Sequence, residues 1–194
     1  MSRTPIASRA YERRRLRLCA REARGCVLDL GHAQLPNPFL DQATTVGLDR
    51  IRPDPPSGYS YDVVGSVEEL PGILDGRRFD TVIAGELIEH LERPYDFLRS
   101  IRDVLRVNGR LVLSTPNPIG FPTLLLEATR STRWFYTAEH TYYFTPRWVR
   151  RMLERTGYEL ERLVPVGIWL PIGHVPWCPL WCSYQIVYVA CRSS

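Results

Sequence analysis

The sequence contains no lysine. All 25 of its basic residues are arginine, against 21 acidic residues, and the 194-residue chain has a formal net charge of +4. A lysine is needed for a Schiff base on the protein, for a lysine general base and for the phosphate-binding loop of nucleotide triphosphatases. The sequence therefore excludes these three kinds of chemistry.

Cysteine and long apolar segments are also scarce. The five cysteines are odd in number and irregularly spaced, and the first thirty residues lack the apolar run of a secretory signal. An uncharged stretch covers residues 163–191, but its four prolines and two glycines exclude a continuous membrane-spanning helix. We expect a cytoplasmic protein in a reducing compartment, with no transmembrane segment.

The positive charge is concentrated at the N-terminus. Residues 1–24 carry eight arginines and two glutamates, whereas residues 25–194 have a net charge of −2. The spacing of residues 11–20 predicts an amphipathic helix whose arginines face water, and an arm that binds nucleic acid is the alternative. We interpret residues 1–24 as a basic helix or arm and residues 25–194 as the main domain.

Strand and helix patterns alternate along the main domain. Apolar runs typical of buried parallel strands occupy 26–31, 44–49, 61–64, 79–84 and 109–115. Helical spacing covers 67–74, 86–106, 121–130 and 146–156, and two more strand patterns cover 158–164 and 184–191. Pro94 interrupts or restarts the second helix, and Asn108-Gly109 is expected to end it. This order predicts a parallel sheet covered on both faces, with an antiparallel pair at one edge.

Ligands of such sheets bind beyond the carboxyl ends of the strands. Gly31 allows a tight turn after the first strand, and Asp49, eighteen residues later, can accept hydrogen bonds from two ribose hydroxyls. This pair predicts a nucleoside-type ligand. The other candidate cofactor-binding residues at the strand ends are Asp29, His32, Ala33, Arg50, Ser66, Val67 and Gly85.

Five segments carry a family resemblance. They are residues 27–31, 46–49, 79–91, 109–117 and 139–145. In order and spacing they resemble the successive motifs of class I S-adenosylmethionine-dependent methyltransferases, and most of all the branch related to ubiquinone-pathway O-methyltransferases. The resemblance implies a Rossmann-like, doubly wound α/β fold. Its mostly parallel sheet would have seven strands and an antiparallel last strand, with S-adenosylmethionine across the strand ends.

The resemblance also implies O-methylation of a small-molecule or lipid-like acceptor, but the sequence departs from the family at two places. The usual Gly-x-Gly-x-Gly turn is here Gly31-His32-Ala33-Gln34-Leu35, and Leu35 adds bulk beside the methionine part of the cofactor. Ser66 stands where the family often has an acid that binds the adenine amino group. The altered turn motivates one alternative, a non-catalytic interaction protein with the methyltransferase fold.

A second constellation is Glu86-x-x-Glu89-His90, whose spacing places three side chains on one helix face. Two carboxylates and an imidazole suit Mg²⁺ or Mn²⁺. A similar motif, completed by a later histidine, binds a divalent metal in small-RNA 3′-terminal 2′-O-methyltransferases, and this resemblance implies His140 as the fourth ligand. Together with the basic N-terminus it motivates another alternative, an RNA methyltransferase.

Without a metal, the same glutamates and His90 would form a helix cap and packing pair, and His140 becomes the candidate general base. Aromatic residues stand on both sides of His140, at 134–136 and 142–144. They are expected either to line an aromatic acceptor pocket or to anchor a lid.

Overall fold

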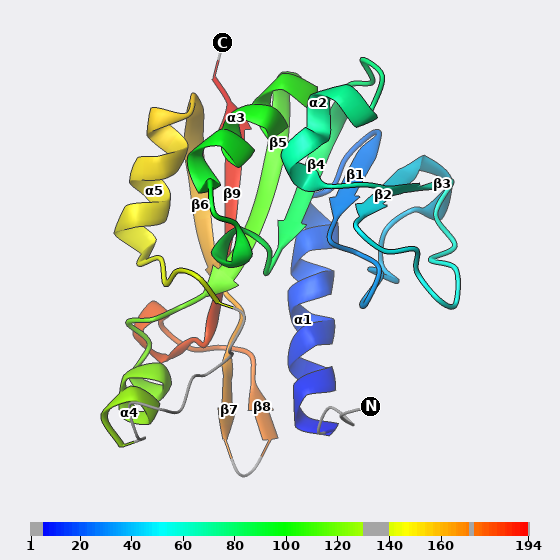
Figure 1. Ribbon diagram of the computed structural model, residues 1–194. Helices are drawn as coiled ribbons and strands as arrows, with labels where there is room; N and C mark the ends of the chain where they lie inside the picture. Colours follow the sequence, from blue (N-terminus) through cyan, green and yellow to red (C-terminus); the bar gives the residue numbers. More distant parts are fainter. Residues whose placement is uncertain (1–5, 130–139, 171–172, 194) are drawn as a thin grey trace.

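A seven-stranded sheet forms the centre of the computed structural model, which describes residues 6–129, 140–170 and 173–193 (Figure 1). The strand order is β3-β2-β1-β4-β5-β9-β6. Its members are β1 (Val27–Leu30), β2 (Thr45–Asp49), β3 (Tyr61–Val64), β4 (Phe79–Gly85), β5 (Leu105–Pro116), β6 (Tyr158–Pro165) and β9 (Gln185–Arg192). Strands β1 to β5 pair in parallel, whereas β9 is antiparallel to both β5 and β6. The predicted mostly parallel sheet with an antiparallel last strand is confirmed.

Helices cover the two faces of the sheet unequally. The helices are α1 (Ile6–Glu22), α2 (Leu70–Ile73), α3 (Pro94–Val104), α4 (Phe121–Thr129) and α5 (Pro146–Arg155), with 3-10 turns η1 (Gln42–Thr44), η2 (Val67–Glu69), η3 (Ile88–His90) and η4 (Leu180–Cys182). Helices α2, α3 and α5 pack on the face that carries Leu28 and Leu111, while α1 packs on the face of Val27 and Val112. Successive strand residues point to opposite faces, so one apolar run supplies both cores.

Three small elements lie beyond the carboxyl ends of the central strands. Helix α4 and the antiparallel hairpin of β7 (Ile168–Leu170) and β8 (Gly173–Val175) gather there, at the same end of the molecule as the start of α1 (Figure 1). Within the described residues, none of the helices is long and apolar enough to span a bilayer.

The predicted helix over 86–106 is wrong in its first part. The chain leaves β4 at Glu86 in a left-handed conformation, with φ of 53°, and then forms only the short turn η3. Helix α3 begins at Pro94, where the missing N–H of proline costs nothing, so the predicted restart is confirmed. The helix ends at Val104 rather than at Asn108-Gly109, because Leu105 already pairs with Phe79 of β4.

The arginines of α1 do not all face water. Arg13, Arg17 and Arg21 are exposed, as predicted, but only 7% of Arg15 is accessible. The guanidinium of Arg15 donates to Glu12 Oε2 from Nε (2.9 Å) and Nη2 (2.6 Å). Arg15 is therefore buried together with a carboxylate partner from the same helix, Glu12.

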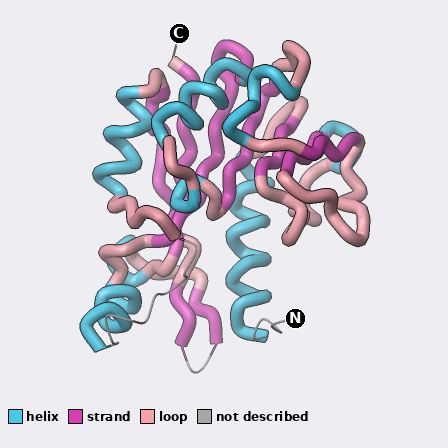
Figure 2. Tube along the Cα trace, in the orientation of Figure 1, coloured by secondary structure: helices cyan, strands magenta, loops and turns pink. Residues whose placement is uncertain are grey.

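No α-helix connects β1 to β2. Residues 31–41 run as irregular chain into η1, visible as loop in Figure 2, and Pro36 and Pro38 disfavour a helix here. Buried polar groups hold the loop instead. The Tyr59 hydroxyl donates to Asp29 Oδ2 (2.7 Å) and accepts from the Asn37 N–H (2.7 Å), and Asn37 Nδ2 donates to the carbonyl of Leu16 in α1 (2.9 Å). The loop and α1 together cover this face.

Replacing Tyr59 by Phe should destabilise the fold, because it leaves the Asp29 carboxylate and the Asn37 N–H without their buried partner. We expect the free energy of unfolding to fall by about 1 to 3 kcal/mol, measured by urea denaturation. The matched control is Tyr61→Phe, since Tyr61 is 57% exposed and its hydroxyl makes no hydrogen bond among the described residues. Equal losses in the two variants would contradict this role of Tyr59.

Candidate active site

The carboxyl ends of β1, β2 and β4 meet at the middle of the sheet. Strand β1 lies between β2 and β4, so the chain crosses to opposite sides of β1 at this point. Gly31 follows β1 with φ of 72°, and its N–H donates to the carbonyl of Leu48 (2.9 Å). A Cβ on Gly31 would meet Leu87 only at an ordinary 3.5 Å, so the backbone conformation, rather than space, requires glycine here.

Asp49 ties the turn after β1 to the end of β2. Its Oδ2 accepts from the N–H of Ala33 (2.8 Å), and its Oδ1 accepts from the N–H of Ile51 (3.3 Å). The structure therefore brings Gly31, Ala33 and Asp49 together, as the strand-end argument predicts. The neighbouring Arg50 is exposed and lies 3.9 Å from a carboxylate oxygen of Glu68.

Two of the predicted cofactor residues point into the fold. His32 is 2% exposed, its Nε2 lies 2.8 Å from Asp62 Oδ1, and its ring stacks on Tyr59 with the centroids 5.4 Å apart. Asp29 is buried as the acceptor of the Tyr59 hydroxyl, and burial raises its pKa to about 6 although that hydrogen bond opposes the rise. Both side chains belong to the polar cluster under the β1–β2 loop.

The remaining predicted residues lie at the ends of β3 and β4. Ser66 caps η2, its Oγ accepting from the N–H of Glu68 (3.3 Å), and Val67 is buried against the core. Gly85 ends β4, and a Cβ at this position would collide with Nη1 of Arg15. The end of the Arg15 side chain thus occupies the space that a side chain at Gly85 would need.

Arg15 is a central residue that the sequence argument missed. Its Nη1 lies 3.4 Å from Ser114 Oγ of β5, and its other nitrogens hold Glu12. Burial would lower the pKa of Arg15, but the carboxylates of Glu12 and Glu86 outweigh it and raise the pKa. Glu12 is a local partner of Arg15, but Ser114 and Glu86, the other groups around its guanidinium, lie far away in the chain.

Glu86 faces β5 and β9. Its Oε1 accepts from the Ser114 hydroxyl (2.9 Å) and its Oε2 accepts from Nε2 of Gln185 (2.7 Å). Burial raises the pKa of Glu86 to about 6, although Arg15 opposes the rise. The prediction that Glu86 shares a helix face with Glu89 and His90 is wrong, because a left-handed residue and a 3-10 turn replace the expected helix.

Three of the four predicted metal-ligating residues nevertheless converge. One ligand atom from each of Glu89, His90 and His140 lies within 4.8 Å of the others, and the two imidazole centroids are 4.8 Å apart. The N–H groups of Thr141 and Tyr142 donate to the carbonyl of Glu89 (2.9 and 3.1 Å). These two hydrogen bonds fix the segment that carries His140 against η3.

The carboxylate of Glu89 is in an unusual environment. Glu89 is 1% exposed, and neither of its oxygens has a hydrogen-bond partner within the residues described. Burial, followed by the charge of Glu86, raises the pKa of Glu89 well above its usual value, while the charge of Arg15 opposes the rise. A buried carboxylate in such an environment is either protonated or able to bind a cation.

An aromatic cavity of about 530 Å³ adjoins this cluster. Its walls include Tyr142, Tyr143, Phe144 and Trp148, together with the start of α3. The ring of Tyr143 meets that of His140 edge to face, with the centroids 5.7 Å apart. The other predicted aromatic group, at 134–136, lies outside the described residues.

Comparison with known proteins agrees with this architecture. A methyltransferase-domain family model matches residues 5–163. A ubiquinone biosynthesis O-methyltransferase of Dinoroseobacter shibae is 28% identical over 129 residues, which cover 60% of this chain and 52% of that protein. The chain therefore spans about half the length of this relative.

Solved structures share the fold at low sequence identity. A SAM-dependent methyltransferase of Thermotoga maritima, a possible histamine N-methyltransferase, superposes with a TM-score of 0.73 at 15% identity, covering 95% of this chain and 89% of that one. The magnesium protoporphyrin IX methyltransferase of Synechocystis, solved with bound SAH, gives a TM-score of 0.66 at 15% identity, covering 100% and 90%. With the family match over residues 5–163, the chain belongs to the class I S-adenosylmethionine-dependent methyltransferase family.

Proposed function

We propose that this chain transfers a methyl group from S-adenosylmethionine to an oxygen atom of a small or lipid-like acceptor. The observation that carries the proposal is that two groups of residues lie beside each other at the carboxyl ends of the strands. Gly31 and Asp49 form a nucleoside-type cradle, and the titratable cluster of Glu89, His90 and His140 follows the adjacent strand β4. The O-methyltransferase relative supports oxygen as the accepting atom.

The proposed cofactor cradle follows the strand ends. The turn at Gly31 would take the methionine part and Asp49 the ribose. Each Asp49 oxygen accepts one backbone N–H and keeps a lone pair for a ribose hydroxyl, so the residue fits this role. Ser66 and Val67 would flank the adenine, because Ser66 Oγ retains acceptor capacity beyond its capping bond.

The other candidate residues take supporting parts in this proposal. Ala33 and Arg50 would border the cradle on either side of Asp49, and Gly85 would form its floor above Arg15. Asp29 and His32 would support the turn at Gly31 without touching the cofactor, since their buried hydrogen bonds hold the loop that carries it.

For methyl transfer the protein has to orient the acceptor towards the methyl group and to remove one proton from it. S-adenosylmethionine, when bound, supplies a methyl group on a sulfonium that is already a good leaving group. His140 would accept the proton of the acceptor hydroxyl as the oxygen gains the methyl group. Glu89 lies beside it, and its raised pKa suits it to share the proton that His140 takes.

A divalent cation is the alternative use of the same cluster. Glu89, His90 and His140 would hold it, and one carboxylate with two imidazoles suits Mn²⁺ better than Mg²⁺. Such an ion would lower the pKa of the acceptor hydroxyl. The carboxylate of Glu89, which has no hydrogen-bond partner among the described residues, favours a metal. Against it, the carboxylate of Glu86 is bound to Ser114 and Gln185 and is not available as the second carboxylate ligand.

The aromatic cavity is the proposed site for the apolar part of the acceptor. Its volume of about 530 Å³ lies within the range of small-molecule sites. Tyr143 connects it to His140, so an acceptor lying along the aromatic wall would have its hydroxyl near the imidazole. This placement favours a small or lipid-like acceptor over RNA.

Asp49→Ala should weaken S-adenosylmethionine binding by about 1.5 to 3 kcal/mol, the usual value for hydrogen bonds to a charged group. Isothermal titration calorimetry measures the affinity, and Asp103→Ala, an exposed carboxylate of α3, is the control. Unchanged affinity in Asp49→Ala would refute the ribose assignment. If the unaltered chain bound no cofactor at millimolar concentration, the non-catalytic alternative would replace the proposed function.

His140→Gln should lower methyl transfer by about 10²- to 10⁴-fold while leaving cofactor affinity unchanged, because it removes only the proton acceptor. Release of S-adenosylhomocysteine with a panel of hydroxyl-bearing acceptors reports the rate, and His174→Gln is the matched histidine control. We expect activity to persist in a chelator. Loss in the chelator, restored by Mn²⁺ in the unaltered chain but not in Glu89→Gln, would assign the cluster to a metal instead.

A further inference from the structure

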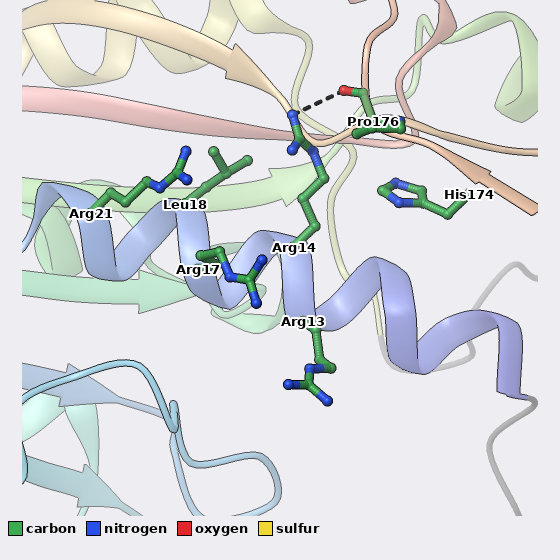
Figure 3. Close-up of a pocket in the computed structure, with 7 residues that line it drawn as sticks. All are labelled: Arg13, Arg14, Arg17, Leu18, Arg21, His174 and Pro176. Carbon is green, nitrogen blue, oxygen red and sulfur yellow. Dashed lines mark hydrogen bonds between the residues drawn. The ribbon is translucent and has the colours of Figure 1, made fainter.

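A second cavity lies between α1 and the segment around β8, and none of its lining residues belongs to the strand-end site. It measures about 390 Å³ and is lined by four arginines of α1 together with Leu18, His174 and Pro176 (Figure 3). The arginines are Arg13, Arg14, Arg17 and Arg21. Leu18 contributes the apolar part of the helix wall, and the segment from β8 to Pro176 forms the opposite wall.

The positive charge of this cavity is left unpaired by the part of the chain that the structure describes. Among the described residues, none of the four arginines has a carboxylate within ion-pair distance. Other arginines nearby do, since Arg15 pairs with Glu12, and Arg110 and Arg162 both pair with Glu22. Residues 25–194 have a net charge of −2, so the excess belongs to this helix and not to the surface in general.

Three of the four side chains are held in place. Arg14 donates from Nε to the carbonyl of Val166 (2.6 Å) and from Nη2 to that of Pro176 (3.0 Å, dashed in Figure 3). The guanidinium groups of Arg13 and Arg17 lie over the ring of Phe39, 5.8 and 4.8 Å from its centroid. Restrained side chains lose less conformational entropy when a ligand binds.

The charged groups of the cavity act on one another and on His174. Burial lowers the pKa of Arg14, and the charge of Arg21 lowers it further. Burial and then the charge of Arg14 lower the pKa of His174 on the opposite wall. An anion beside Arg14 and Arg21 would offset the repulsion between these two guanidinium groups.

We infer that this arginine cavity binds the phosphate group or groups of a small phosphorylated molecule. Guanidinium forks match phosphate oxygens in pairs, which a cavity built from arginine exploits better than one built from lysine. The volume of about 390 Å³ lies within the range of small-molecule sites. The cavity shares no residue with the proposed methyl-transfer site, so the two proposals stand independently.

Pyrophosphate is the probe for this site, titrated calorimetrically into the full chain at constant ionic strength. The variant Arg17→Gln/Arg21→Gln removes two exposed charges of the cavity and leaves Arg14 in place. We expect it to weaken pyrophosphate binding about tenfold or more, as the loss of charge-assisted contacts predicts. The control Arg147→Gln/Arg151→Gln removes two exposed charges from α5 and should change the affinity less than about twofold.

Two results would overturn the inference. One is the absence of pyrophosphate binding by the unaltered chain at millimolar concentration. The other is an equal loss in the two double variants, which would mean that only net charge matters. Thermal unfolding of both variants, expected to match the unaltered chain, excludes misfolding as the cause of a loss.

A further arm identifies the source of the phosphate. If it is a lipid headgroup, the chain sediments with vesicles that contain phosphatidylglycerol, and pyrophosphate releases it. If the ligand is soluble, pyrophosphate binds and the vesicles do not retain the chain. Tight binding of a single-stranded RNA that millimolar pyrophosphate does not displace, lost in Arg17→Gln/Arg21→Gln, would replace the small molecule by nucleic acid and overturn the inference.

Discussion

The buried guanidinium of Arg15 is the interaction on which the strand-end architecture depends. A cation in the interior is costly unless it is paired, and Arg15 has Glu12 beside it on α1 and the charge of Glu86 at the end of β4. Its guanidinium occupies the space beside Gly85, and a Cβ at that position would displace it. The electrostatic attraction between Arg15 and Glu86 also favours the orientation of Glu86 towards Ser114. The converging cluster therefore consists of Glu89, His90 and His140 without Glu86.

Polar contacts hold the connection between the parallel strands β1 and β2, where a crossover usually contains a helix. The loop after β1 is fixed by Tyr59, Asp29 and Asn37, while Asp49 holds the turn from the side of β2. Gly31 can keep its left-handed conformation because both ends of the loop are anchored. A departure from the family's glycine pattern is thus compatible with an ordered turn, since hydrogen bonds supply the restraint that a following helix would supply.

The sequence predicted the sheet well and the site only in part, for a physical reason. Buried parallel strands such as β1 and β4 are mostly apolar runs, and a proline such as Pro94 is favoured in the first turn of a helix. The conformation of Glu86 and the burial of Arg15 depend on partners about one hundred residues away in the chain. Local spacing predicted a helix face over 86–90. Where these long-range contacts form, the structure has a left-handed Glu86 and a 3-10 turn instead.

Helix α1 carries neighbouring arginines in two different environments, one buried against the sheet and one partly exposed. Successive residues of a helix point about 100° apart, so Arg14 and Arg15 leave the axis in different directions. Arg15 turns inward over Gly85, whereas Arg14 reaches outward to the carbonyls of Val166 and Pro176. The same helix thus links the end of β4 to the segment after β8, and its two neighbouring arginines belong to different sites.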